Sequence, residues 1–108
     1  MSKNRELIAI LRGLTLGRCV MVSEILIAEG FSKLEVPLNS PYPMETISEM
    51  QNNFGNSVTI GAGTVTNVSE VNELSKLGCQ MIVSPNTDTQ VIKATKNEGM
   101  LSFPGAFT

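Results

Sequence analysis

Short apolar runs alternate with longer amphipathic stretches along the chain, and this order constrains the fold more than any other feature. The short runs have the length of buried strands, and the longer stretches carry apolar residues at helical spacing. Glycine or proline stands at nearly every junction, where each marks a turn. Strands that alternate with helices in this way form a parallel sheet with right-handed crossovers.

The pattern predicts five strands with a helix between each pair. We expect the strands at residues 7–11, 34–38, 58–60, 79–83 and 100–103. Thr15 predicts the start of the first helix, and Gly30 predicts its end. The buried face of that helix would carry Val22, Ile25 and Leu26.

Two of the later helices carry start signals of their own. Asn67 is followed three residues later by Glu70, which is the spacing of a capping box. Thr87 and Gln90 repeat this spacing before the last helix. We therefore expect Asn67 and Thr87 to cap these two helices.

Two architectures contain this order of elements: an open doubly wound sheet and a closed (β/α)8 barrel. A complete barrel takes roughly 200 to 250 residues, whereas this chain has 108. We therefore expect residues 1–108 to form one α/β domain, the N-terminal half of a (β/α)8 TIM barrel from its first strand to its fifth. The two outer strands of such a half would be open edges that favour association with another chain.

Composition supports a packed domain and argues against several kinds of partner. The chain is 42% hydrophobic and 17% charged, with a net charge of −2, so charge gives no reason to expect nucleic acid or a membrane surface as partner. No apolar run reaches the roughly 18 residues of a membrane span, and the start lacks the pattern of a secretory signal. We expect a cytoplasmic protein.

Histidine is absent, which removes imidazole bases and the commonest metal ligand. Cys19 and Cys79 stand far apart in apolar segments, so we expect buried, reduced thiols rather than a disulfide or a zinc site. We expect neither a metal nor a cofactor, and acid–base chemistry then falls to carboxylates, lysine, tyrosine or water. Most of the methionines are expected to fill the core: Met21, Met44, Met50, Met81 and Met100.

Glu35 is a single carboxylate inside the apolar run 34–38. Strand alternation places Leu34, Val36 and Leu38 on one face, against the helices. Glu35 then points the other way, toward the barrel axis. A buried carboxylate is costly unless it is paired or has a raised pKa, and a raised pKa suits a general acid/base. The pattern leaves open whether Glu35 has that role or forms a structural ion pair with an arginine.

Other polar residues stand at the C-terminal ends of the strands, where (β/α) barrels collect their reacting groups. Arg12 follows the first strand and could bind a carboxylate or a phosphate, or form an ion pair at the rim. Residues 61–64 (GAGT) let a ligand approach the backbone, but they lack the third glycine and the acid of a dinucleotide fingerprint. Pro85 most simply ends the fourth strand.

Five motifs occupy these strand ends in order: residues 8–13 (IAILRG), 34–41 (LEVPLNSP), 61–65 (GAGTV), 82–86 (IVSPN) and 103–105 (FPG). Together they resemble the class I aldolases that cleave 2-keto-3-deoxy-6-phosphogluconate or its galactonate epimer. The resemblance covers essentially the whole chain. It implies a (β/α)8 barrel that is usually assembled as a homotrimer, and a small phosphorylated keto-deoxy sugar acid as substrate.

The resemblance also implies roles for single residues. Glu35 would be the general acid/base, Arg12 and Thr64 would hold the pyruvate-end carboxylate, and Pro85 would line the pocket near the pyruvate moiety. Asn39 stands in the substrate-binding motif where the gluconate enzymes carry an arginine. This form resembles the galactonate branch, so we expect 2-keto-3-deoxy-6-phosphogalactonate to be cleaved to pyruvate and glyceraldehyde 3-phosphate.

A class I aldolase needs a lysine amine that forms a Schiff base with the substrate ketone. In the family that the chain resembles, this lysine lies on the sixth strand, whereas the lysines here are at positions 3, 33, 76, 93 and 96, none of them expected near Glu35. We therefore expect the chain alone to be inactive. It could be a fragment of a full enzyme, half of a barrel that a second chain completes, or a non-catalytic half-barrel that binds a small carboxylate or associates.

Overall fold

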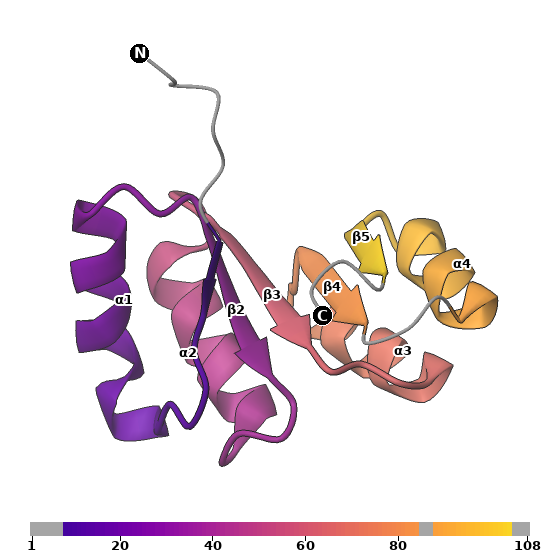
Figure 1. Cartoon of the computed structure of the whole chain (residues 1–108), viewed down its shortest axis with the longest axis horizontal. Helices are drawn as coiled ribbons and strands as arrows, with labels where there is room; N and C mark the ends of the chain where they lie inside the picture. The colour runs from indigo at the N-terminus through magenta and orange to yellow at the C-terminus, as the bar shows by residue number, and fades with distance from the viewer. Residues whose placement is uncertain (1–7, 85–87, 105–108) are drawn as a thin grey trace.

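A computed structural model of the protein describes residues 8–84 and 88–104, in which five parallel strands form one sheet in the order of the sequence (Figure 1). All four strand pairings are parallel. This confirms the α/β class and the order expected for part of a barrel. The strands are β1 (Ile8–Ile10), β2 (Lys33–Pro37), β3 (Thr59–Gly63), β4 (Met81–Ser84) and β5 (Leu101–Pro104).

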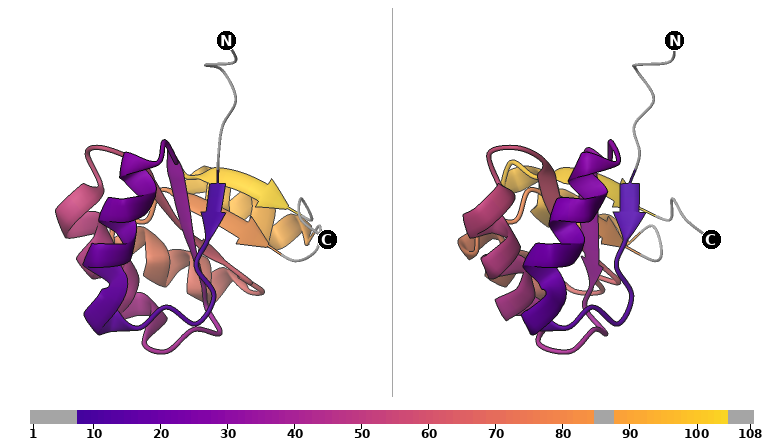
Figure 2. Two further views of the ribbon diagram at one scale, coloured as in Figure 1. Left: turned by 60° about the vertical axis from the view of Figure 1, so that its left-hand side comes forward. Right: turned by 90° about the vertical axis from the view of Figure 1, so that its left-hand side faces the viewer.

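A helix connects each strand to the next, and a short 3-10 turn precedes the first helix. Helices α1 and α2 pack on each other, and α3 and α4 form a second pair, as the two further views show (Figure 2). Within the described residues, no helix combines the length and the apolar character needed to cross a membrane. The helical elements are η1 (Leu16–Arg18), α1 (Cys19–Ala28), α2 (Pro43–Phe54), α3 (Val68–Lys76) and α4 (Thr89–Asn97).

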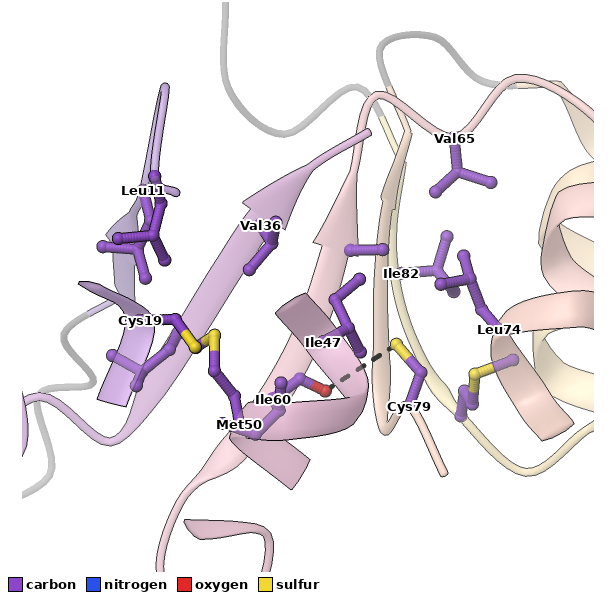
Figure 3. Close-up of a cluster of buried hydrophobic side chains, with 14 of the residues drawn as sticks. Leu11, Cys19, Val36, Ile47, Met50, Ile60, Val65, Leu74, Cys79 and Ile82 are labelled. Carbon is purple, nitrogen blue, oxygen red and sulfur yellow. Dashed lines mark hydrogen bonds between the residues drawn. The ribbon is translucent and has the colours of Figure 1, made fainter. Parts of the chain in front are cut away.

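The hydrophobic core lies between the helices and one face of the sheet (Figure 3). Leu34 and Val36 of β2 are fully buried in it, as strand alternation predicts. Cys79 donates a long hydrogen bond from its Sγ to the Ile60 carbonyl, 3.8 Å away. Cys79 and Cys19 are both buried and free, as expected, and burial raises the pKa of both thiols.

The opposite face of the sheet carries different residues. Met81 and Val83 of β4 are buried, yet they stand outside the core cluster, so they belong to the inner face of the curved sheet. Among the described strands, β1 and β5 each have a neighbour on one side only. Ile10 and Leu101 on these edge strands are 42% and 49% exposed, which leaves apolar surface at both edges.

The helix starts differ in part from expectation. Asn67 caps α3 as predicted, because its side chain accepts from the Glu70 N–H at 2.9 Å. Asp88, not Thr87, caps α4 by accepting from two backbone N–H groups, and Thr87 lies outside the described residues. Thr15 precedes η1 rather than α1, and its side chain makes no capping hydrogen bond.

The buried face of α1 was predicted correctly for Val22 and Leu26, which are partly buried against the core, but wrongly for Ile25. Ile25 is 56% exposed, whereas Ser23 is fully buried. Apolar side chains of α1 itself occupy most sides of the helix, so their spacing does not define a single inward face. Met21 on the same helix is 49% exposed and does not fill the core, whereas Met50 and Met100 do. Met81 is also buried, but on the inner face of the sheet.

Candidate functional site

The C-terminal ends of the first four strands converge on a small cavity of about 160 Å³. Because parallel strands present their carboxyl ends at one edge of a sheet, residues far apart in sequence meet there. The cavity lies on the inner face, away from the helix-covered core. Its lining residues are Ile10, Arg12, Glu35, Pro37, Thr64, Val83 and Ser84.

Glu35 is the most buried charged group of this cavity, with 4% of its surface exposed. It occupies the middle of β2, and its carbonyl accepts from the Leu11 N–H at 2.9 Å, which fixes the backbone beside β1. The side chain lies directly over Gly63: a Cβ placed there would overlap Oε2 and Cδ of Glu35. Gly63 therefore provides the space that the carboxylate occupies.

Two opposing effects act on the Glu35 carboxyl group. Burial raises its pKa above the ordinary 4.5, because the charged form loses solvation, while the nearby Arg12 guanidinium lowers the pKa by a smaller amount. The net shift is upward. A carboxyl group with a raised pKa can donate and accept protons closer to neutral pH than an ordinary glutamate can.

Thr64 reaches the cavity from a strained backbone position. Its φ of 59° lies in the left-handed region, which is uncommon for a β-branched residue. The flanking residues fix this turn: Leu38 N–H donates to the Gly63 carbonyl at 2.9 Å, and Val65 N–H donates to the Val83 carbonyl at 3.4 Å. Strain of this kind tends to occur at functional sites, and here it directs an exposed Thr64 to the rim.

Of the five residues predicted for the site, three line this cavity together: Glu35, Arg12 and Thr64. Glu35 faces inward, as the alternation of β2 predicts. Asn39 is exposed in the turn after β2 and is not among the lining residues. Pro85 lies outside the described residues. The roles of these residues stay predictions.

The described lysines lie outside the lining of the Glu35 cavity. Lys33 is the first residue of β2 and is 7% exposed, and it lines a separate hollow at the amino ends of the strands. Lys76 belongs to α3, and Lys93 and Lys96 belong to α4; all three are exposed. Within residues 8–84 and 88–104, no lysine lines the Glu35 cavity.

Ser84 is 3% exposed, lines the cavity and has an interaction partner. The sequence placed it in the motif at residues 82–86, but no role was predicted for it. The contact between Gly63 and the Glu35 side chain was missed. Strand register could not reveal it, since the residue paired with Glu35 is Gly61.

Comparison with known proteins gives one family and a consistent fold. The aldolase family model for KDPG and KHG aldolase matches residues 1–108. The 2-dehydro-3-deoxy-6-phosphogalactonate aldolase of Escherichia coli (strain K12) is 40% identical over 102 residues, which is 94% of this chain and 50% of that protein. A probable enzyme of the same name from Rhizobium meliloti is 41% identical, covering 96% and 49%. A 2-dehydro-3-deoxy-phosphogluconate aldolase from Zymomonas mobilis is 32% identical, covering 78% and 39%.

Solved structures agree with this result. A native KDPGal structure superimposes with a TM-score of 0.90 at 40% identity, covering 94% of this chain and 49% of that one. The KDPG aldolase of Legionella pneumophila, with pyruvate captured as a covalent carbinolamine, gives a TM-score of 0.81 at 25% identity, covering 90% and 47%. The chain thus spans about half the length of the curated galactonate-type relatives that it matches.

Proposed function

The chain belongs to the KDPG and KHG aldolase family, and we propose that it forms the acid/base and carboxylate-binding side of a class I aldolase. The substrate we propose is 2-keto-3-deoxy-6-phosphogalactonate, cleaved to pyruvate and glyceraldehyde 3-phosphate. Identities of 40% and 41% to the two galactonate-type relatives, against 32% to the gluconate-type relative, support this choice. Asn39, in place of the arginine expected in gluconate enzymes, supports it as well.

The single observation that carries the proposal is the buried Glu35 carboxyl group, held over Gly63 with a raised pKa. In the proposed reaction this group gives a proton to the carbinolamine hydroxyl, which leaves as water. It then takes the proton of the C4 hydroxyl while the C3–C4 bond breaks, and the bonding electrons pass into the enamine of pyruvate. One carboxyl group serves both steps because it alternates between acid and base.

Arg12 and Thr64 are proposed to hold the carboxylate at the pyruvate end of the substrate. A guanidinium can bind a carboxylate through two parallel hydrogen bonds, and the Thr64 hydroxyl can donate a third. Both residues line the Glu35 cavity, so a carboxylate bound there would place the adjacent ketone close to the acid/base. Pro85 is proposed to line the same end.

The Schiff-base amine is proposed to come from residues other than the described lysines, since none of these lines the Glu35 cavity. The chain alone should therefore not cleave the substrate. We also propose that the assembled enzyme is a homo-oligomer, a trimer as in the family that the chain resembles.

A complementation experiment tests the proposal. The chain is produced together with the part of the Escherichia coli galactonate aldolase that it does not cover, and pyruvate release is measured. Glu35→Gln should lower kcat by at least about 100-fold, the usual contribution of an acid/base group. Glu24→Gln, an exposed glutamate on α1, is the matched control and should stay within about twofold, as surface substitutions do.

Equal kcat for Glu35→Gln and Glu24→Gln would show that the carboxyl group has no part in proton transfer. Pyruvate release by the chain without the complementing part would contradict the proposed origin of the amine.

A second candidate function is association without catalysis, favoured by the exposed apolar residues Ile10 and Leu101 on the edge strands. In that case the chain would bind pyruvate, and lose this binding on Arg12→Ala, but would show no turnover when complemented. Titration with pyruvate beside the complementation assay separates the two functions.

A further inference from the structure

One layer of register partners crosses the whole sheet at the level of Glu35. Residues that are paired in this way point to the same side of the sheet, and such layers fill the interior of a barrel. Among the members of this layer, Glu35 alone is charged, so the carboxyl group has apolar neighbours at its own level. From β1 to β5 the members are Ile10, Glu35, Gly61, Met81 and Leu101.

Met81 extends toward Glu35 within this layer. A Cβ placed on Gly61 would lie 2.6 Å from Met81 Cε, so the end of the Met81 side chain occupies the place that Gly61 leaves empty. Gly61 is in turn the register partner of Glu35, and neighbouring strands lie about 4.8 Å apart. Because Gly61 has no side chain, nothing on β3 separates Met81 from Glu35 at this level.

Two glycines of β3 make this arrangement possible. Gly61 and Gly63 lie on the same face of the strand, about 6–7 Å apart. The Glu35 carboxyl group fills the space over Gly63, and the end of Met81 fills the space over Gly61. The thioether therefore lies on the amino-end side of the carboxyl group. The Cys79 thiol donates a hydrogen bond to the Met81 carbonyl at 3.3 Å, which helps to fix the backbone of Met81.

Packing of the helix-covered core does not account for Met81. The core cluster contains Met50 and Met100 but not Met81, although Met81 is fully buried. On the inner face its neighbour is the polar Glu35 cavity. A thioether has no hydrogen-bond donor and adapts its shape to the space that it fills. Met81 can therefore exclude water from one side of the Glu35 carboxyl group without hydrogen bonding to it.

We propose that Met81 is a positioning residue for Glu35, and that its thioether forms the apolar surface against which the carboxyl group is held. This inference rests on the proposed function, because it assigns a residue to the task of keeping the acid/base group out of water. A carboxyl group that loses contact with water favours its protonated form. Met81 acts through Glu35 and is not proposed to contact the substrate.

Charged groups face Glu35 from two elements. Arg12, after β1, lowers the pKa of Glu35 by less than burial raises it. Lys33 stands two residues before Glu35, on the same face of β2. The described residues of β3, β4 and β5 include no charged side chain. A substitution of Met81 therefore changes the solvation of Glu35 and leaves these charges in place.

Nuclear magnetic resonance of the chain with ¹³C-labelled glutamate tests the inference. The side-chain carboxyl carbon of Glu35, assigned by its absence in Glu35→Gln, is followed against pH at constant ionic strength. Met81→Gln keeps the chain length and adds an amide that can donate to the carboxylate. It should lower the pKa of Glu35, with a rise of about threefold or more in the acid dissociation constant. Met81→Leu keeps an apolar side chain of similar volume and should change this constant by less than about twofold.

Met100→Gln is the matched control, since it places the same amide at a buried methionine of the helix-covered core. It should destabilise the protein and leave the dissociation constant of Glu35 unchanged. If Met81→Gln does not fold, Met81→Ala takes its place. That variant opens space for water beside the carboxyl group, so the constant should rise in the same direction.

Equal dissociation constants of Glu35 in the wild type and Met81→Gln overturn the inference, as does an equal rise in Met100→Gln. A rise in Met81→Leu as large as in Met81→Gln also overturns it, because the apolar character of residue 81 would then not matter. The titration needs no turnover, whereas the complementation assay measures kcat. The positioning role of Met81 and the acid/base role of Glu35 can therefore fail independently.

Discussion

Replacing Gly63 by alanine should displace the Glu35 side chain, because the new methyl group would occupy the space of its carboxylate. The Cβ would overlap Oε2 and Cδ and lie 3.2 Å from Cγ. Forcing a methyl group into a packed position costs about 1–3 kcal/mol. The φ of Gly63 is not positive, so alanine fits the backbone there and recovers about 0.4–1 kcal/mol from the unfolded chain. The net loss of stability should be about 1–2 kcal/mol.

The same substitution should have the opposite sign when Glu35 is first replaced by alanine. The overlapping atoms are then absent, so Gly63→Ala should stabilise by about 0.4–1 kcal/mol. Urea unfolding of the wild type, both single variants and the double variant gives the coupling free energy between the two positions. We expect about 2 kcal/mol, which is within the range for residues in direct contact.

Gly61→Ala is the matched control in the same strand. Its Cβ would lie 2.6 Å from Met81 Cε and 2.7 Å from the Met81 carbonyl oxygen, and it meets no atom of Glu35. It should destabilise the protein, but by a similar amount with or without Glu35. Additivity of Gly63→Ala and Glu35→Ala within about 0.5 kcal/mol would refute the inference that Gly63 provides the space for the carboxylate.

Two further predictions concern charge and capping. The folded state raises the pKa of Glu35 above 4.5, so this residue favours folding most below its unfolded pKa, and its contribution falls as pH rises through the folded pKa. Urea unfolding from pH 4 to pH 8 should therefore show Glu35→Gln gaining stability relative to the wild type, and a parallel pH profile would contradict the raised pKa. Asn67→Ala should cost about 1 kcal/mol through loss of the α3 cap, whereas Asn72→Ala, exposed within the same helix, should be neutral or slightly stabilising. Equal unfolding free energies for the two variants would contradict the capping role.

The order of the strands followed from sequence, although β3 extends to Gly63 instead of ending at Ile60. The orientation of Glu35 followed as well, because a strand has only two faces. Once Leu34 and Val36 are assigned to the core, Glu35 must point the other way. The sequence also predicted that the strand ends lie close together, since the carboxyl ends of parallel strands meet at one edge of the sheet. Arg12 and Thr64 were found at the site for this reason.

The wrong predictions concern positions where the sequence allows more than one local arrangement. Apolar residues cover most sides of α1, so spacing could not show that Ser23 is buried and Ile25 exposed. Thr87 and Asp88 are adjacent residues that can both cap a helix, and the stronger acceptor Asp88 was overlooked.

The fit of Glu35 over Gly63 depends on the distance between two strands that are remote in sequence. Gly63 and Glu35 lie on neighbouring strands but are not register partners. This feature therefore required coordinates.

Borohydride reduction in the presence of pyruvate tests most directly the claim that this chain supplies the acid/base side and not the amine. Mass spectrometry of the chain alone should show no pyruvate adduct. With the complementing part of the Escherichia coli relative present, the adduct should appear on a lysine of that part. An adduct on any lysine of residues 1–108, above all on Lys33 of β2, would contradict the division of roles between the Glu35 cavity and the amine.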